Sequence, residues 1–145
     1  MEKILKIEEC FGFDGIEDAW CEQDGFKITT SEQEIYLVMD NMQCCCENFG
    51  YFMSEDNIDN FIGAALLDIK ITDTMSKSVT MNTLNDRCLD LDDKGDIDIY
   101  DGGVMFVDII TSNGVLQFVA YNEHNGYYGH EARVISKQLK HSQCL

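Results

Sequence analysis

The sequence predicts an α+β domain made mainly of antiparallel β-sheet, in meanders and hairpins, with one short helix near residues 55–62. Runs of alternating or β-branched apolar residues, separated by short polar breaks, predict the strands. The segment Thr111-Ser112-Asn113-Gly114, between two such runs, has the composition of a hairpin turn. With 145 residues, 45% of them hydrophobic, the chain is long enough for one domain with its own core.

The N-terminal part is predicted to be a meander of antiparallel strands. The expected strands cover residues 3–10, 16–22, 26–30 and 34–39. Gln23-Asp24-Gly25 and Ser31-Glu32-Gln33 have turn compositions and separate the last three of these strands. Residues 41–53 are rich in cysteine and aromatic residues without a clear period, and we expect an irregular connection over one end of the sheet.

The short helix is predicted from its start signal and its apolar spacing. Ser54-Glu55-Asp56 offers a capping side chain followed by acids, which favour the positive end of a helix dipole. Ile58, Phe61 and Ile62 then fall on one face, and Gly63 is placed to end the helix. This face is expected to pack in the core.

The C-terminal half is predicted to return to β-structure. A strand at residues 66–71 follows the helix, and residues 104–110 and 115–121 form the hairpin around the turn at Asn113-Gly114. Residues 131–139 are expected to be a last strand that closes the sheet. The polar residues 141–145 are expected to be a frayed tail.

The single domain, residues 1–145, is expected to carry an acidic, variable insertion at about residues 73–103. Apolar periodicity weakens over this segment, and residues 86–101 are rich in aspartate. Such a composition favours an exposed loop or a loosely held hairpin.

The charge of the chain excludes some partners and leaves others. A formal net charge of -17 excludes binding to duplex nucleic acid and to an anionic membrane surface, because both need cationic protein surface. It leaves room for a small phosphorylated ligand in an enclosed, locally positive pocket. The seven cysteines lack the spacing of a disulfide scaffold, and the N-terminus lacks a signal-peptide pattern. We therefore expect a cytoplasmic protein with reduced thiols.

Asn122 to His130 is the most informative stretch of the sequence. An ordinary hairpin turn needs little more than Asn125-Gly126, but here that pair is surrounded by histidines, tyrosines and a further glycine. These residues supply stacking faces, hydrogen-bonding groups and permissive backbone positions, which suit a small polar ligand with a flat ring. A well-packed structural loop is the alternative interpretation.

The predicted ligand site joins this stretch with aromatic residues from the first half of the chain. Tyrosines and histidines can enclose a purine while asparagine contacts its edge, and Arg133, one of two arginines, can contact a phosphate. A surface ion pair with a carboxylate is the alternative role for Arg133. The predicted ligand-binding residues are Phe49, Tyr51, Asn122, His124, Asn125, Gly126, Tyr127, Tyr128, His130 and Arg133.

The sequence predicts neither a metal site nor a catalytic site. Adjacent Cys44, Cys45 and Cys46 lack the paired spacing of zinc ligands, even with His124 and His130 nearby. Residues 90–101 resemble a calcium-binding EF-hand loop, but a lysine occupies its fifth position and an aspartate its last. No phosphate-binding glycine motif or nucleophile signature is present. We therefore expect no catalytic residues, no metal and no cofactor, and hence not an enzyme.

Three segments together resemble a family of small phage and prophage proteins: Cys45-Cys46-Glu47, the residues 59–63 that lead into 66–69, and Tyr121-Asn122 with Asn125-Gly126-Tyr127-Tyr128. The chain looks like a member of the Thoeris anti-defence sponge family, over roughly residues 43–135. The resemblance implies a homo-oligomer that acts in the infected bacterial host. It implies binding, without cleavage, of cyclic ADP-ribose isomers and in some members of cyclic oligonucleotides.

The sequence therefore predicts sequestration of a cyclic nucleotide immune signal that would counter bacterial anti-phage defence. Two other classes stay open. One is an acidic interaction or inhibitor protein that mimics nucleic acid and occupies a basic host protein. The other is a metal-dependent hydrolase.

Overall fold

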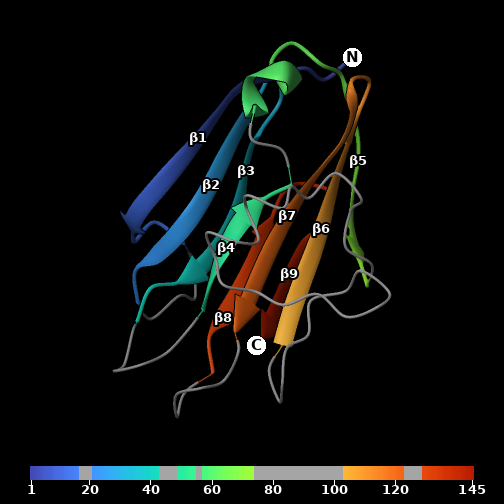
Figure 1. Cartoon of the computed structure of the whole chain (residues 1–145). Coiled ribbons are helices and arrows are strands. Elements are labelled where there is room, and N and C mark those ends of the chain that lie inside the picture. Colours follow the sequence, from blue (N-terminus) through green and yellow to red (C-terminus); the bar gives the residue numbers. More distant parts are fainter. Residues whose placement is uncertain (17–20, 43–48, 55–56, 74–102, 123–128) are drawn as a thin grey trace.

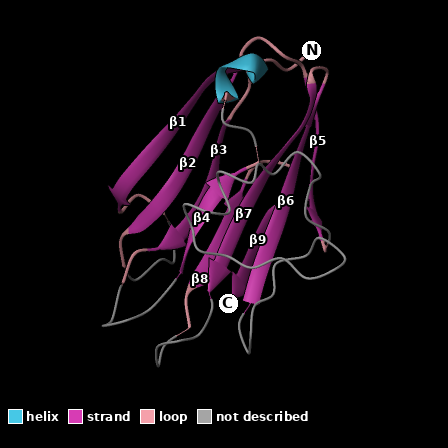
Figure 2. Cartoon of the chain, viewed as in Figure 1, coloured by secondary structure: helices cyan, strands magenta, loops and turns pink. Residues whose placement is uncertain are grey.

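The computed structural model describes residues 1–16, 21–42, 49–54, 57–73, 103–122 and 129–145, and these residues form two antiparallel β-sheets packed face to face (Figure 1). Strands dominate the described chain, as Figure 2 shows. No helix long and apolar enough to cross a membrane occurs in the described residues.

The first sheet has five strands in the order β1-β2-β3-β8-β9. Its strands are β1 (Ile4–Phe13), β2 (Gln23–Thr30), β3 (Glu34–Asp40), β8 (Glu131–Ile135) and β9 (Lys140–Cys144). The meander predicted for the N-terminal part is confirmed as β1, β2 and β3, which pair in sequence order. The end of the chain then returns to this sheet, because β8 pairs with β3 and β9 pairs with β8.

The second sheet has four strands in the order β4-β7-β6-β5. Its strands are β4 (Phe49–Met53), β5 (Leu66–Thr72), β6 (Gly103–Thr111) and β7 (Gly114–Asn122). The predicted hairpin is confirmed by the pairing of β6 with β7, in which Thr111 faces Gly114. The threonine hydroxyl stabilises this turn, since it donates to the Gly114 carbonyl at 2.7 Å.

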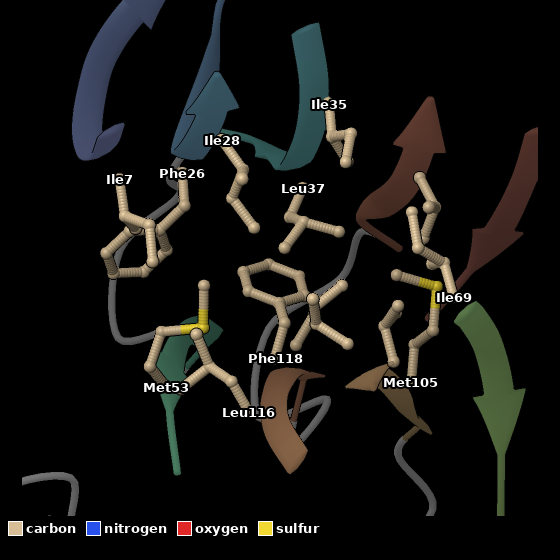
Figure 3. Packing of buried hydrophobic residues seen from close by; sticks show 14 of the residues in the cluster. Ile7, Phe26, Ile28, Ile35, Leu37, Met53, Ile69, Met105, Leu116 and Phe118 are labelled. Carbon is tan, nitrogen blue, oxygen red and sulfur yellow. The ribbon is translucent and has the colours of Figure 1, made fainter. Parts of the chain in front are cut away.

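The core lies between the two sheets and contains alternate residues from both. Phe26 of β2 meets Phe118 of β7 edge to face, with ring centroids 6.3 Å apart, and Leu37 is buried beside Phe118 (Figure 3). Because side chains alternate across a strand, the residues between these core positions lie on the outer faces of the sheets.

The predicted helix is wrong, and the domain is a β protein rather than α+β. The described part of that segment contains one turn of 3₁₀ helix, η1 (Ile58–Phe61). Ser54 is instead tied to β7, because its hydroxyl accepts the backbone N–H of Gln117 at 2.9 Å and its own N–H donates to the Gln117 carbonyl at 2.8 Å. The predicted core face is confirmed for Phe61, which is 5% exposed, and is wrong for Ile62, which is 39% exposed.

Three boundaries also differ from the prediction. Gln23-Asp24-Gly25 belongs to β2 rather than to a turn, and a side chain at Gly25 would overlap the carbonyl oxygen of Leu37 on β3. Residues 49–53 form strand β4 rather than an irregular connection, because their apolar side chains pack against the core. Residues 141–145 are not frayed, since β9 pairs with β8 and Leu145 is buried.

Two further expectations lie partly outside the described residues. Within the expected strand at 16–22, Ile16 and Cys21 are not in a strand, and residues 17–20 are not described. The acidic insertion falls almost entirely on residues 74–102, also outside the described chain, and stays a prediction.

Candidate functional site

Three of the predicted ligand-binding residues meet at one end of the two sheets. Phe49 begins β4, Asn122 ends β7, and His130 precedes β8. The structure adds Asp40, at the end of β3, and Leu145, at the end of the chain. We call these five residues the His130 cluster.

The His130 cluster is held by contacts within the protein. The imidazole Nδ1 lies 2.6 Å from a carboxylate oxygen of Asp40, and its ring stacks on Phe49 with centroids 3.6 Å apart. The other oxygen of Asp40 accepts the backbone N–H of Glu131 at 2.7 Å. Only 1% of His130 is exposed. These contacts order the start of β8.

The chain end completes the cluster. Leu145 and His130 exchange two backbone hydrogen bonds, of 2.7 and 3.1 Å, and the Asn122 amide donates to the Leu145 carbonyl at 3.1 Å. Because Asn122 is 1% exposed, this buried hydrogen bond holds Leu145 against the end of β7. His124, Asn125, Gly126, Tyr127 and Tyr128 lie outside the described residues, so their predicted role stays a prediction.

Tyr51 lines an acidic cavity of about 260 Å³ where β1 of one sheet approaches β4 of the other, and this cavity adjoins the His130 cluster through Asp40 and Phe49. Its hydroxyl donates to Glu9 at 3.0 Å. Burial raises the pKa of Tyr51, and the hydrogen bond to Glu9 and the charges of Glu9 and Asp24 raise this pKa further. We call this cavity the acidic mouth; its negative potential disfavours an anionic ligand. It is lined by Glu9, Phe11, Asp24, Met39, Asp40, Asn41, Phe49, Gly50 and Tyr51.

Arg133 borders a different and larger cavity, of about 420 Å³, on the outer face of the five-stranded sheet. We call it the outer-face pocket. Ile16 lies at its border and is buried there although it does not belong to the core cluster. The pocket is lined by Gly15, Ile16, Tyr36, Arg133, Val134, Ile135, Lys140, His141 and Ser142.

Strand register explains why these side chains meet. Arg133 on β8 faces Ser142 on β9, and the next outward residue, Ile135, faces Lys140 on β9 and Tyr36 on β3. Neighbouring strands lie about 4.8 Å apart and same-face residues along a strand about 7 Å apart. One small area therefore contains an aromatic ring, an apolar side chain, two cationic groups and a hydroxyl, from Tyr36, Ile135, Arg133, Lys140 and Ser142.

Ion pairs and ring contacts fix two of these side chains. A guanidinium nitrogen of Arg133, Nη2, lies 3.1 Å from a carboxylate oxygen of Glu131, and 12% of the arginine side chain is exposed. The ring of Tyr36 stacks on Phe13 with centroids 5.0 Å apart, while its hydroxyl donates to Glu34 at 3.0 Å. Burial raises the pKa of Tyr36, followed by the hydrogen bond to Glu34, so this phenol stays neutral at physiological pH.

The structure thus separates Arg133 from the other predicted site residues that it describes. Phe49, Asn122 and His130 meet in the His130 cluster, Tyr51 lines the adjoining acidic mouth together with Phe49, and Arg133 lies in the outer-face pocket. The prediction missed Tyr36, Lys140 and Ser142 as neighbours of Arg133. Residues 140–144 read Lys-His-Ser-Gln-Cys and show no apolar alternation, and residues 141–145 are predicted to be a tail, so no local signal identifies the last two.

Metal-ligating side chains do not form a site in the described chain. No group of three or more His, Cys, Asp or Glu residues placed to hold a metal ion occurs there. The EF-hand-like residues 90–101 and Cys44 to Cys46 lie outside the described residues.

Fold and pocket together define the class of this protein: an antiparallel two-sheet β protein with a basic pocket on the outer face of one sheet. A family model described as "Domain of unknown function (DUF7448)" matches residues 1–134, and the chain belongs to this family. The matched region includes Tyr36 and Arg133 and ends before β9. No curated protein and no solved structure matches the chain.

Proposed function

We propose that this protein binds, without cleaving, a cyclic nucleotide immune signal such as a cyclic ADP-ribose isomer, and thereby counters bacterial anti-phage defence in the cytoplasm of an infected host. One observation carries the proposal. The outer-face pocket brings Arg133 and Lys140 together beside the ring of Tyr36, in a chain whose net charge is -17.

The size and chemistry of the outer-face pocket support a nucleotide ligand. Its volume of about 420 Å³ lies within the range of small-molecule sites, roughly 300–1,000 Å³. A guanidinium, an ammonium and a hydroxyl suit phosphate oxygens, because charge-assisted hydrogen bonds are the strong ones. Tyr36 and Ile135 offer a ring and an apolar surface to a base.

The local charge also supports an anionic ligand despite the acidic chain. Two of the ten lysines and arginines of the sequence border this one cavity. Acidic surface elsewhere slows the approach of an anion but acts weakly within the pocket, since salt screens charges over about 8–10 Å. A sequestering protein depends on slow release more than on fast capture.

Calorimetry against a panel of nucleotides tests the proposal. The panel comprises a cyclic ADP-ribose isomer, cyclic AMP and a cyclic dinucleotide, and we expect binding of at least one with micromolar or tighter affinity. The bound ligand, released by heat, should be chemically unchanged in chromatography and mass spectrometry. Absence of binding across the panel, or recovery of a cleaved product, would contradict the proposal.

A lysine variant locates the binding site. Lys140→Gln should weaken binding about tenfold, because it removes one charge-assisted interaction worth about 1.4 kcal/mol. Lys6→Gln is the matched control, since Lys6 is an exposed lysine on β1, away from the pocket lining. Equal weakening by the two variants would show a general charge effect and would place the ligand elsewhere.

A further inference from the structure

Glu131 lies where an anionic ligand of the outer-face pocket would make its contact with Arg133. A carboxylate oxygen of Glu131 is 3.1 Å from Nη2 of Arg133. Carboxylate and phosphate oxygens use the same donors of a guanidinium, so the two compete for it. The glutamate is two residues from the arginine on the same face of β8, which keeps it close at all times.

The two partners of this ion pair differ in their freedom to move. About 12% of the Arg133 side chain is exposed, against 34% of the Glu131 side chain. Glu131 can therefore turn its carboxylate into water while the guanidinium stays at the pocket. Its backbone stays fixed meanwhile, because the Glu131 N–H donates to Asp40, which also binds the buried His130.

We propose that Glu131 is a tethered competitor that sets the affinity of the outer-face pocket for phosphate-bearing ligands. The inference rests on the proposed function, because it concerns the same pocket. Without ligand, the carboxylate of Glu131 forms an ion pair with the guanidinium of Arg133. An incoming phosphate displaces this side chain, while the backbone between Asp40 and Arg133 keeps its conformation.

A tethered competitor has a defined kinetic effect. It reduces the fraction of protein whose guanidinium is open to ligand, and the apparent affinity falls by that fraction. The association rate constant falls by the same factor, whereas dissociation proceeds from a complex in which Glu131 is already displaced. A substitution that removes the charge of Glu131 should therefore increase mainly the association rate constant.

The test compares Glu131→Gln with wild type, using inorganic pyrophosphate in calorimetry and a fluorescent ADP analogue in stopped-flow kinetics. Glu131→Gln should bind both probes about fivefold more tightly, with a faster association rate and a dissociation rate within about twofold of wild type. Glu131→Asp keeps the charge but shortens the side chain by one methylene, and should give an intermediate affinity. Neither change removes the backbone hydrogen bond to Asp40.

Glu8→Gln is the matched control. Glu8 pairs with Lys6 at 3.1 Å on the outer face of β1 and is 39% exposed, so its substitution changes the net charge equally. An equal gain in Glu8→Gln, or no gain in Glu131→Gln when wild type binds the probes, overturns the inference and leaves the proposed function standing. Failure of both wild type and Glu131→Gln to bind either probe overturns the proposed function and the inference with it.

Discussion

The His130 cluster and the outer-face pocket contain similar residue types but use them differently. Both lie along β8 and both combine a ring with charged and polar groups. In the His130 cluster the polar atoms bond to the protein, and His130 is 1% exposed. In the outer-face pocket, Lys140 and Ser142 are exposed beside a cavity. The surroundings of a side chain, more than its type, distinguish a stabilising contact from a binding contact.

The largest effect that tests this comparison is a loss of stability on Asp40→Asn. The Asp40 carboxylate accepts from His130 and Met42 on one oxygen and from Glu131 on the other. An asparagine must turn its NH₂ group toward one of these donors, which leaves a buried donor without an acceptor. We expect the free energy of unfolding to fall by about 2 kcal/mol, measured by urea denaturation.

The control for this change is Asp14→Asn, an exposed position outside the strands. It should alter the free energy of unfolding by less than about 0.5 kcal/mol. If Asp40→Asn were equally mild, the His130 cluster would not stabilise the fold, and its residues would again be candidates for ligand binding.

A smaller effect, on binding instead of folding, is expected for Arg133→Lys. The lysine keeps the positive charge but lacks the planar fork of donors that matches phosphate oxygens. Affinity for the ligand identified by calorimetry should fall about tenfold, equivalent to about 1.4 kcal/mol. The free energy of unfolding should fall by less than it does in Asp40→Asn, and the reverse order would contradict the division into two regions.

The sequence predicted most of the sheet but only part of the candidate site. Alternation and turn composition are local signals, and they located β1, β3 and the β6–β7 hairpin. The helix failed because its capping signal at Ser54 was outweighed by a tertiary contact with Gln117, 63 residues away. Local propensity does not include such contacts.

The candidate site depends on pairings that local patterns do not contain. Arg133 is predicted as a phosphate contact from its chemistry, its scarcity and its position three residues after His130, but its neighbours come from β3 and β9, which pair on either side of β8. Strand order therefore decided which residues meet. His130 was predicted as a ligand contact because nothing in the sequence indicates Asp40, 90 residues away, as its partner.

The smallest predicted effect compares Tyr51 in the acidic mouth with Tyr36 in the outer-face pocket. The pKa of Tyr51 in the folded protein is raised above its usual value of about 10, first by burial and then by the hydrogen bond to Glu9. For a group with a raised folded pKa, the stabilisation is fully present below the unfolded pKa and is lost as the pH rises through the folded pKa. Wild type should therefore lose stability relative to Tyr51→Phe as the pH rises above about 10.

Urea denaturation at a series of pH values between about 8 and 11 measures this difference, and Tyr36→Phe serves as the comparison. The pKa of Tyr36 is also raised by burial, but the positive charge of Lys27 opposes the increase. The loss of stability of wild type with rising pH should therefore be larger relative to Tyr51→Phe than relative to Tyr36→Phe. Equal losses would mean that burial, the Glu9 hydrogen bond and the nearby carboxylates hold the proton of Tyr51 no more strongly than the surroundings of Tyr36 hold its proton.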